Sequence, residues 1–130
     1  MTEPRWIRRQ ALVFLHSESL AAHGGASGLR DEGLLDSALA RPRNRFLYEP
    51  EADLPGLAAS YGFGLAKNHP FVDGNKRAAF HAIGLFLAIS GLRLTANQID
   101  AIQTILKLAA SQLPEEELAV WIRTHSLPRT

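Results

Sequence analysis

The stretch from Ala78 to Leu92, AAFHAIGLFLAISGL, restricts the fold more than any other feature, since its fifteen residues include no Asp, Glu, Lys or Arg. It predicts a helix that is apolar on nearly every side, and such a helix must be enclosed by other elements rather than lie on a surface. A helix that crosses a membrane needs roughly twenty apolar residues, so no membrane span is expected. The stretch therefore predicts the buried central helix of a helical bundle.

Three further helices are predicted before this central one. Apolar residues recur at helical spacing over 8–23, and Gly24 with Gly25 can end that helix. The segment 28–42, GLRDEGLLDSALARP, has acidic residues at its start and Pro42 as a stop, which favours a short second helix. Over 54–67 the small residues Gly62 and Gly64 lie among well-spaced apolar ones, which predicts a third helix packed very closely against a neighbour.

The segment between Pro42 and Pro55, RNRFLYEPEADL, mixes charged, aromatic and proline residues. This mixture is too irregular for a helix and long enough for a working loop or small hairpin. We expect a small flap here, ahead of the polar motif described below. The arginines at positions 41, 43 and 45 would lie on it, either solvated or in contact with a target or nucleotide.

Two more helices are predicted after the central one. Thr95 and Gln98 have capping-box spacing, and the helix that follows would have an apolar face. That face consists of Ile99, Ile102, Leu106 and Ala109. Pro114 at a first helical position, followed by three glutamates, predicts a sixth helix with Leu118, Trp121 and Ile122 inward. We expect Trp6 and Trp121 to belong to the core.

The length and composition are those of one folded domain covering residues 1–130. The six helical patterns, with scarcely a strand pattern, predict an all-α bundle of about six helices around the buried one. Fourteen Lys and Arg balance thirteen Asp and Glu, so a general attraction to nucleic acid or to a membrane surface is not expected. No cysteine is present, which suits a reducing compartment. The run ALVFL near the N-terminus is shorter than a signal-peptide core, and we expect a cytoplasmic protein.

The segment NHPFVDGNKRAAF, residues 68–80, places polar groups directly before the central helix. The first N–H groups of a helix have no partner inside the helix, and together with the helix dipole they can hold a phosphate. Gly74 would let a phosphate approach the backbone, because it has no Cβ. Asn75, Lys76 and Arg77 would add an amide, an ammonium and a guanidinium group as donors.

Two other residues of this segment have chemistry of their own. Asp73 would be misplaced beside phosphates unless it holds a divalent cation, and Mg²⁺ is bound by one or two carboxylates with phosphates and waters. A histidine such as His69 can accept a proton from a hydroxyl near neutral pH. Each residue also has an ordinary structural interpretation, for example Asp73 as a helix cap. Their occurrence within nine residues favours a functional site.

The residues HPFVDGNKR resemble the signature of the Fic/Doc superfamily, and Lys76 makes them more similar to the death-on-curing (Doc) toxins than to the Fic adenylyltransferases. The segments GLRDEGLLDSALARP and GLAKNHPF are also Doc-like, so the resemblance covers roughly residues 6–125. It implies a Fic fold, ATP and Mg²⁺, and phosphorylation of a threonine of elongation factor Tu, which halts translation. It also implies a toxin–antitoxin pair, in which the C-terminal segment of the antitoxin occupies a groove on the toxin.

Through this resemblance, His69 would be the general base and Asp73 the Mg²⁺ ligand. Gly74 and Asn75 would form the phosphate nest, while Lys76 and Arg77 would hold the phosphates of ATP and stabilise charge in the transition state. Phe71 would anchor the loop in the core.

The Fic adenylyltransferase pattern, HPFxxGNGRxxR, has a second arginine where this chain has Phe80. This difference and Lys76 favour transfer of the γ-phosphate over transfer of AMP. An adenylyltransferase and a binding module without catalysis remain the alternatives.

His81 would either reach the nucleotide or be a hydrogen-bonded core residue, and the second is favoured. The other histidines lack the spacing of a zinc site. The nearest match to a self-inhibitory Fic motif, SGLRDEG, has one residue too many, so we expect Glu32 to be an ordinary residue of the second helix and an antitoxin to be the control.

Overall fold

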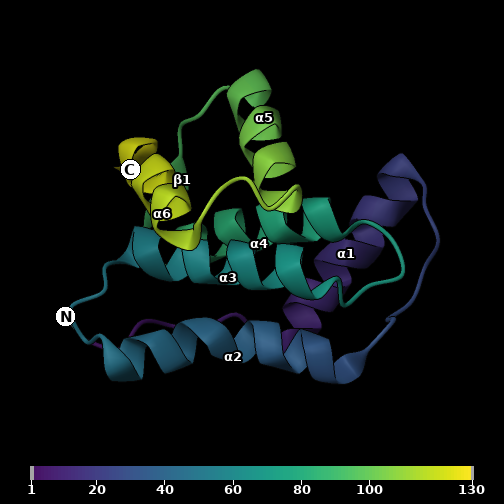
Figure 1. Ribbon diagram of the computed structural model, residues 1–130, viewed down its shortest axis with the longest axis horizontal. Coiled ribbons are helices and arrows are strands. Elements are labelled where there is room, and N and C mark those ends of the chain that lie inside the picture. The colour runs from purple at the N-terminus through teal and green to yellow at the C-terminus, as the bar shows by residue number, and fades with distance from the viewer. Residues whose placement is uncertain (1, 130) are drawn as a thin grey trace.

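In the computed structural model, which describes residues 2–129, the chain forms six helices and a two-stranded antiparallel sheet (Figure 1). The helices are α1 (Arg9–His23), α2 (Glu32–Tyr48), α3 (Leu54–Asn68), α4 (Asn75–Ile89), α5 (Gln98–Ala109) and α6 (Glu115–Thr124). The strands are β1 (Leu92–Leu94) and β2 (Ser126–Pro128). The predicted all-α bundle is thus confirmed. Across residues 2–129, no helix is both long and apolar enough to cross a membrane.

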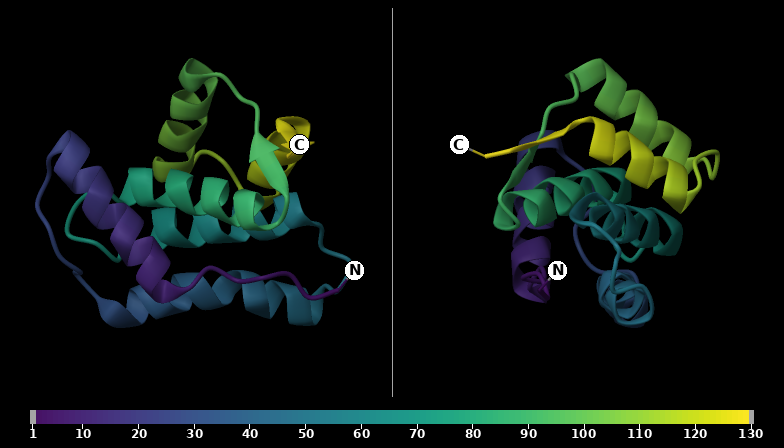
Figure 2. Two further views of the ribbon diagram at one scale, coloured as in Figure 1. Left: turned by 180° about the vertical axis from the view of Figure 1, so that it is seen from behind. Right: turned by 90° about the vertical axis from the view of Figure 1, so that its left-hand side faces the viewer.

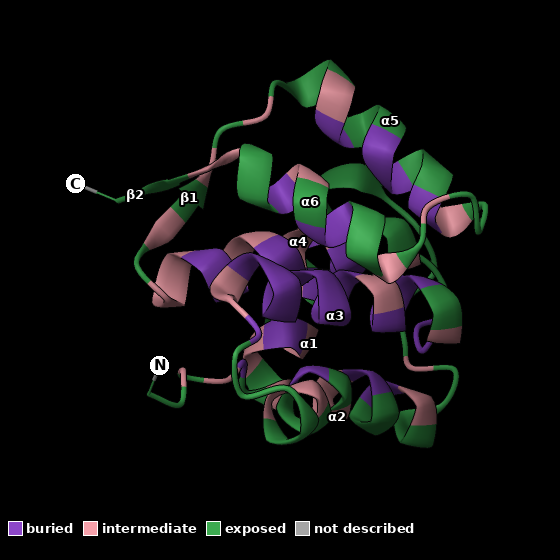
Figure 3. Ribbon diagram, turned by 60° about the vertical axis from the view of Figure 1, so that its left-hand side comes forward, coloured by how far each residue is buried: buried purple, intermediate pink, exposed green. Residues whose placement is uncertain are grey.

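The centre of the bundle is formed by α3 and α4 together (Figure 3). The prediction that α4 is central is confirmed, but α4 keeps one half-buried side that includes Phe80 and His81. Helix α3 is enclosed more completely, since Leu57, Tyr61 and Leu65 on it are fully buried. The small side chains along α3 allow this enclosure, because helices on both sides can approach its backbone.

Two glycines of α3 show how close that approach is. A Cβ added at Gly62 would lie 2.6 Å from Cδ1 of Ile83 in α4, and one added at Gly64 would lie 3.3 Å from Cα of Ala38 in α2. Both distances are shorter than an ordinary van der Waals contact. The close packing predicted for this helix is confirmed, and it fixes the positions of the two helix ends that carry the polar motif.

The flap expected between Pro42 and Pro55 does not exist. Helix α2 continues through Pro42 to Tyr48, although a proline inside a helix removes one hydrogen bond and costs about 3 kcal/mol. Tertiary contacts offset this cost: Pro42 is buried, and Arg45 donates to the carboxylate of Glu115 in α6 and to O of Gly56 in α3, each at 3.0 Å.

The arginines expected on the flap therefore have structural partners. Arg41 pairs with Glu115 at 2.6 Å, and the guanidinium of Arg43 lies 5.9 Å from the ring centre of Trp6. The ring of Trp6 stacks on Phe86 of α4, with centroids 6.1 Å apart, as expected for a core residue.

The C-terminal part differs from the prediction in two details. Asn97, rather than Thr95, caps α5, because its Oδ1 accepts from N of Asp100 at 2.8 Å. Strands β1 and β2 pair over three residues each, with Arg93 opposite Leu127. Three residues are too short to show the alternating pattern by which a strand is predicted. Helix α6 begins after Pro114 with Leu118 and Ile122 buried, as expected, and Trp121 is half-buried.

Candidate active site

The polar motif forms a loop of six residues, 69–74, between the end of α3 and the start of α4; we call it the motif loop. Both of its ends have left-handed backbone conformations, with φ of 49° at His69 and 77° at Gly74. Glycine adopts this conformation without strain, whereas histidine does not. The backbone of His69 is therefore held in place by its surroundings.

Asn75 closes the motif loop from the first turn of α4. Its side-chain Oδ1 accepts from N of Phe71, and its Nδ2 donates to O of Phe71, both at 3.0 Å. The amide predicted to bind phosphate thus has both of its polar atoms in the loop itself. What Asn75 presents to an anion is its main-chain N–H, which like those of Lys76 and Arg77 has no acceptor inside the helix.

Phe71 anchors the motif loop, as the resemblance implied, and is 1% exposed. The ring of His16 in α1 stacks on it, with centroids 3.7 Å apart and planes 11° from parallel. Nε2 of His16 donates to the main-chain O of Asp73 at 2.7 Å. This role was not predicted from the sequence, although Leu12, His16 and Ser19 have the helical spacing of an inward face and all three are buried.

Asp73 is exposed, with its carboxylate held at both oxygens. Oδ1 accepts from N of Gly74 at 2.8 Å and Oδ2 from N of Ala26 at 3.2 Å. The hydrogen bond from Gly74 and then the one from Ala26 hold the pKa of Asp73 below its ordinary value, so the group is ionised at neutral pH. Residues 2–129 include no cluster of three or more possible metal ligands. One ionised carboxylate facing open space nevertheless fits Mg²⁺, which is completed by phosphates and waters.

The segment 24–31, between α1 and α2, lies alongside the motif loop (Figure 2). Its backbone pairs with the loop at three points: N of Val72 donates to O of Gly28 at 3.0 Å, and N of Arg30 and N of Asp31 donate to O of Pro70 at 2.7 and 3.1 Å. This pairing between the segment and the motif loop was not predicted from the sequence.

A cavity of about 800 Å³ opens in front of the motif loop. All six residues predicted for the site line it: His69, Asp73, Gly74, Asn75, Lys76 and Arg77. The side chains of Lys76 and Arg77 are exposed. Phe80, which stands where the adenylyltransferase pattern has an arginine, also lines the cavity.

The opposite wall of the cavity comes from α5. Of the face predicted for this helix, Ile102 and Leu106 line the cavity and are about half exposed, and Ile99 is 71% exposed. The side that packs on the bundle consists instead of Ala101, Thr104, Ile105 and Leu108. The helix is apolar on two sides, so spacing alone did not show which one is buried.

His81 lines the same cavity, one turn beyond Arg77. Its Nδ1 is buried and has no hydrogen-bond partner among the described residues. Burial lowers the pKa of His81, and the nearby basic side chains of His23, Arg77 and His16 lower it further. The hydrogen-bonded core residue that we favoured is therefore wrong, and the neutral imidazole faces the site. Glu32 starts α2 and pairs with Arg9, as expected for an ordinary helix residue.

Two comparisons bear on this arrangement. The sequence shares 33% identity with "Protein kinase doc" of Escherichia phage P1 over 90 residues, which cover 69% of this chain and 71% of that protein. It shares 41% identity with "Toxin Doc" of Mycolicibacterium smegmatis (strain ATCC 700084 / mc(2)155) over 95 residues, covering 70% and 72%. The Fic/DOC family model matches residues 6–87, from Trp6 through most of α4. The chain belongs to the Fic/DOC family.

Proposed function

We propose that this chain is the toxin of a toxin–antitoxin pair, and that it is an ATP- and Mg²⁺-dependent protein kinase acting on a threonine of elongation factor Tu. The observation that carries the proposal is that the six motif residues line one cavity at the start of α4. The names of the two relatives, a protein kinase and a toxin, agree with it. Phosphorylation of this factor would arrest translation in the cytoplasm.

The groups proposed for this reaction lie at the two ends of the motif loop, His69 after α3 and the others at or just before the start of α4. The imidazole of His69 takes the proton of the threonine hydroxyl, whose oxygen bonds to the γ-phosphorus while the bond to the β-phosphate oxygen breaks and ADP leaves. The N–H groups at the start of α4, with the side chains of Lys76 and Arg77, hold the phosphates and stabilise their charge. Asp73 would hold Mg²⁺, which when bound neutralises phosphate charge.

Transfer of the γ-phosphate is favoured over transfer of AMP by two residues of the cavity. Phe80 offers no positive charge where the adenylyltransferase pattern has an arginine, and Lys76 adds a cation where that pattern has a glycine. The adenylyltransferase and the binding module without catalysis are the competing functions.

The exposed apolar residues Ile102 and Leu106 support the proposed control by an antitoxin. They offer an apolar surface next to the motif loop, where the C-terminal segment of an antitoxin would block the cavity.

The test is to incubate the purified chain with elongation factor Tu, MgCl₂ and ATP labelled at either the α- or the γ-phosphate. We expect γ label on a threonine of the factor and none with His69→Ala. The matched control is His125→Gln, which changes a histidine that lies outside the cavity. This variant should transfer phosphate normally. Transfer of α label would replace the kinase by an adenylyltransferase, and no label from either ATP would leave the binding module.

A further inference from the structure

The side chain of Arg30 lies against the backbone at the end of α3, beside His69. Its Nε donates to O of His69 and its Nη2 to O of Asn68, both at 2.8 Å. Its own main-chain N also donates to O of Pro70 at 2.7 Å. One residue thus binds three consecutive carbonyl groups, those immediately before, at and after His69.

These carbonyls need a partner, and His69 needs a restraint. The last carbonyls of a helix have no donor inside the helix, and the dipole makes this end partly negative, so a guanidinium fits both requirements. With φ of 49° and ψ of 56°, the backbone of His69 is in the left-handed region, which histidine occupies only when its surroundings enforce it. The planar fork of Arg30 spans the residue in that conformation.

We propose that Arg30 is a positioning residue for His69: it holds the backbone that aims the imidazole into the cavity, and it touches neither nucleotide nor acceptor. The inference rests on the proposed function, with His69 as the base. Lys cannot replace Arg30 fully, because an ammonium is a single point charge and cannot bind two carbonyls with the fixed geometry of a guanidinium.

The other supports of the motif loop are separate from Arg30. Asn75 holds Phe71, and His16 holds Asp73, so the part of the loop next to the phosphate site keeps its own hydrogen bonds when Arg30 is removed. Loss of Arg30 should therefore lower kcat and leave KM for ATP nearly unchanged. Since a displacement of about 1 Å in a reacting group can cost about 100-fold, we expect Arg30→Ala to lower kcat by about 10- to 100-fold.

The experiment compares Arg30→Ala and Arg30→Lys with the control Arg9→Ala, using γ-labelled ATP and elongation factor Tu. Arg9 is a half-exposed arginine that pairs with side chains of α2 and lies outside the cavity. We expect Arg30→Ala to be slow, Arg30→Lys to be intermediate and Arg9→Ala to equal wild type. Guanidinium ion at millimolar concentration should restore part of the activity of Arg30→Ala and none of that of His69→Ala.

A measurement without catalysis separates this inference from the proposed function. In NMR spectra of labelled protein, the imidazole resonances of His69 should shift and broaden in Arg30→Ala but not in Arg9→Ala, while thermal unfolding checks that each variant is folded. If wild type transfers no phosphate, the proposed function fails, and the His69 resonances still decide the positioning role. Unchanged resonances in Arg30→Ala, or a turnover within about twofold of Arg9→Ala, would overturn the inference.

Discussion

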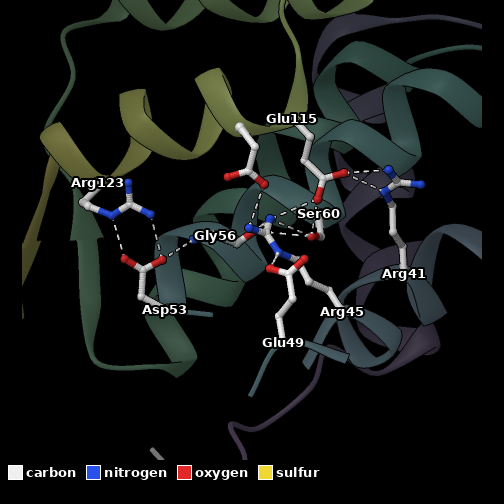
Figure 4. A network of polar contacts seen from close by, with 9 residues as sticks. Arg41, Arg45, Glu49, Asp53, Gly56, Ser60, Glu115 and Arg123 are labelled. Atoms are coloured by element: carbon white, nitrogen blue, oxygen red, sulfur yellow. Dashed lines mark hydrogen bonds and ion pairs between the residues drawn. The ribbon is translucent and has the colours of Figure 1, made fainter. Parts of the chain in front are cut away.

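Glu115, in the first turn of α6, joins three helices through its carboxylate (Figure 4). Oε1 accepts from Nε of Arg41 at 2.8 Å, and Oε2 accepts from Nη1 of Arg45 at 3.0 Å and from Oγ of Ser60 at 2.7 Å. The side chains of Glu115 and Arg45 are 16% and 13% exposed, so water screens this pair only weakly. We therefore expect Glu115→Ala to weaken the attachment of α2 and α6 to α3.

The expected loss in the free energy of unfolding follows from what remains after the substitution. Removing one partner of a buried ion pair costs about 3–5 kcal/mol, because the other charge stays buried and unpaired. Arg45 keeps part of its environment, namely O of Gly56 at 3.0 Å and the carboxylate of Glu116 at 2.8 Å. The loss should accordingly be about 2–3 kcal/mol, which lowers Tm by about 10 °C in a chain of this size.

Glu116→Ala is the matched control. Glu116 lies in the same helical turn, so both variants lose the same favourable interaction with the helix dipole. Its side chain is 74% exposed and pairs with Arg45 at 2.8 Å, and such surface pairs contribute about 0–1 kcal/mol. Urea unfolding followed by far-UV circular dichroism measures both variants. Equal losses in the two would refute the role assigned to the buried carboxylate of Glu115.

Two further predictions concern the packing of α3 and the pH dependence of stability. Gly62→Ala should destabilise by about 1 kcal/mol in urea unfolding, because the new Cβ meets Ile83. The new Cβ of Gly84→Ala in α4 meets no atom of residues 2–129 within 4 Å, so this variant should be more stable by up to about 1 kcal/mol, and a gain in both variants would contradict the close packing of α3. The lowered pKa of His81 means that the unfolded state binds more protons, so its contribution to stability is complete above pH of about 6.5 and is lost as pH falls through the folded-state pKa. Unfolding measured between about pH 7 and 5 should show a smaller loss in His81→Gln than in wild type, and parallel curves would oppose this assignment.

Most helices could be predicted because the residues that begin and end them are close together in the sequence. The predicted flap was wrong because the contact that keeps this segment helical comes from a distant residue. Asp53 caps α3 three residues before the N–H that it binds, and Gly24 ends α1 with φ of 82°. By contrast, α2 passes Pro42 with support from the pair of Arg45 and Glu115, which are 70 residues apart. A local sequence pattern includes Pro42 and not Glu115, so the proline alone indicates a helix end.

The candidate site divides in the same way. The six residues predicted for the site fall within nine positions, so their types and order were enough to place them together. The residues that support them are far away in the sequence: His16 lies 57 residues before Asp73, and Arg30 lies 39 before His69. Only Asn75 is near. Its side-chain amide closes the loop through two hydrogen bonds to Phe71 that spacing does not reveal, while its place in the phosphate nest rests on its main-chain N–H.

Each half of the motif loop is held from a different element. Arg30 restrains His69, while His16 and Asn75 restrain residues 71–73 next to the phosphate nest. The two helices that carry the loop cannot shift freely, since α3 and α4 touch where Gly62 has no side chain. Removing the Arg30 contact should lower kcat, and removing the His16 contact should weaken ATP binding. In a double variant that lacks both contacts, the two changes in free energy, each calculated from kcat/KM, should therefore add nearly independently. Strong non-additivity would mean that the loop behaves as one unit.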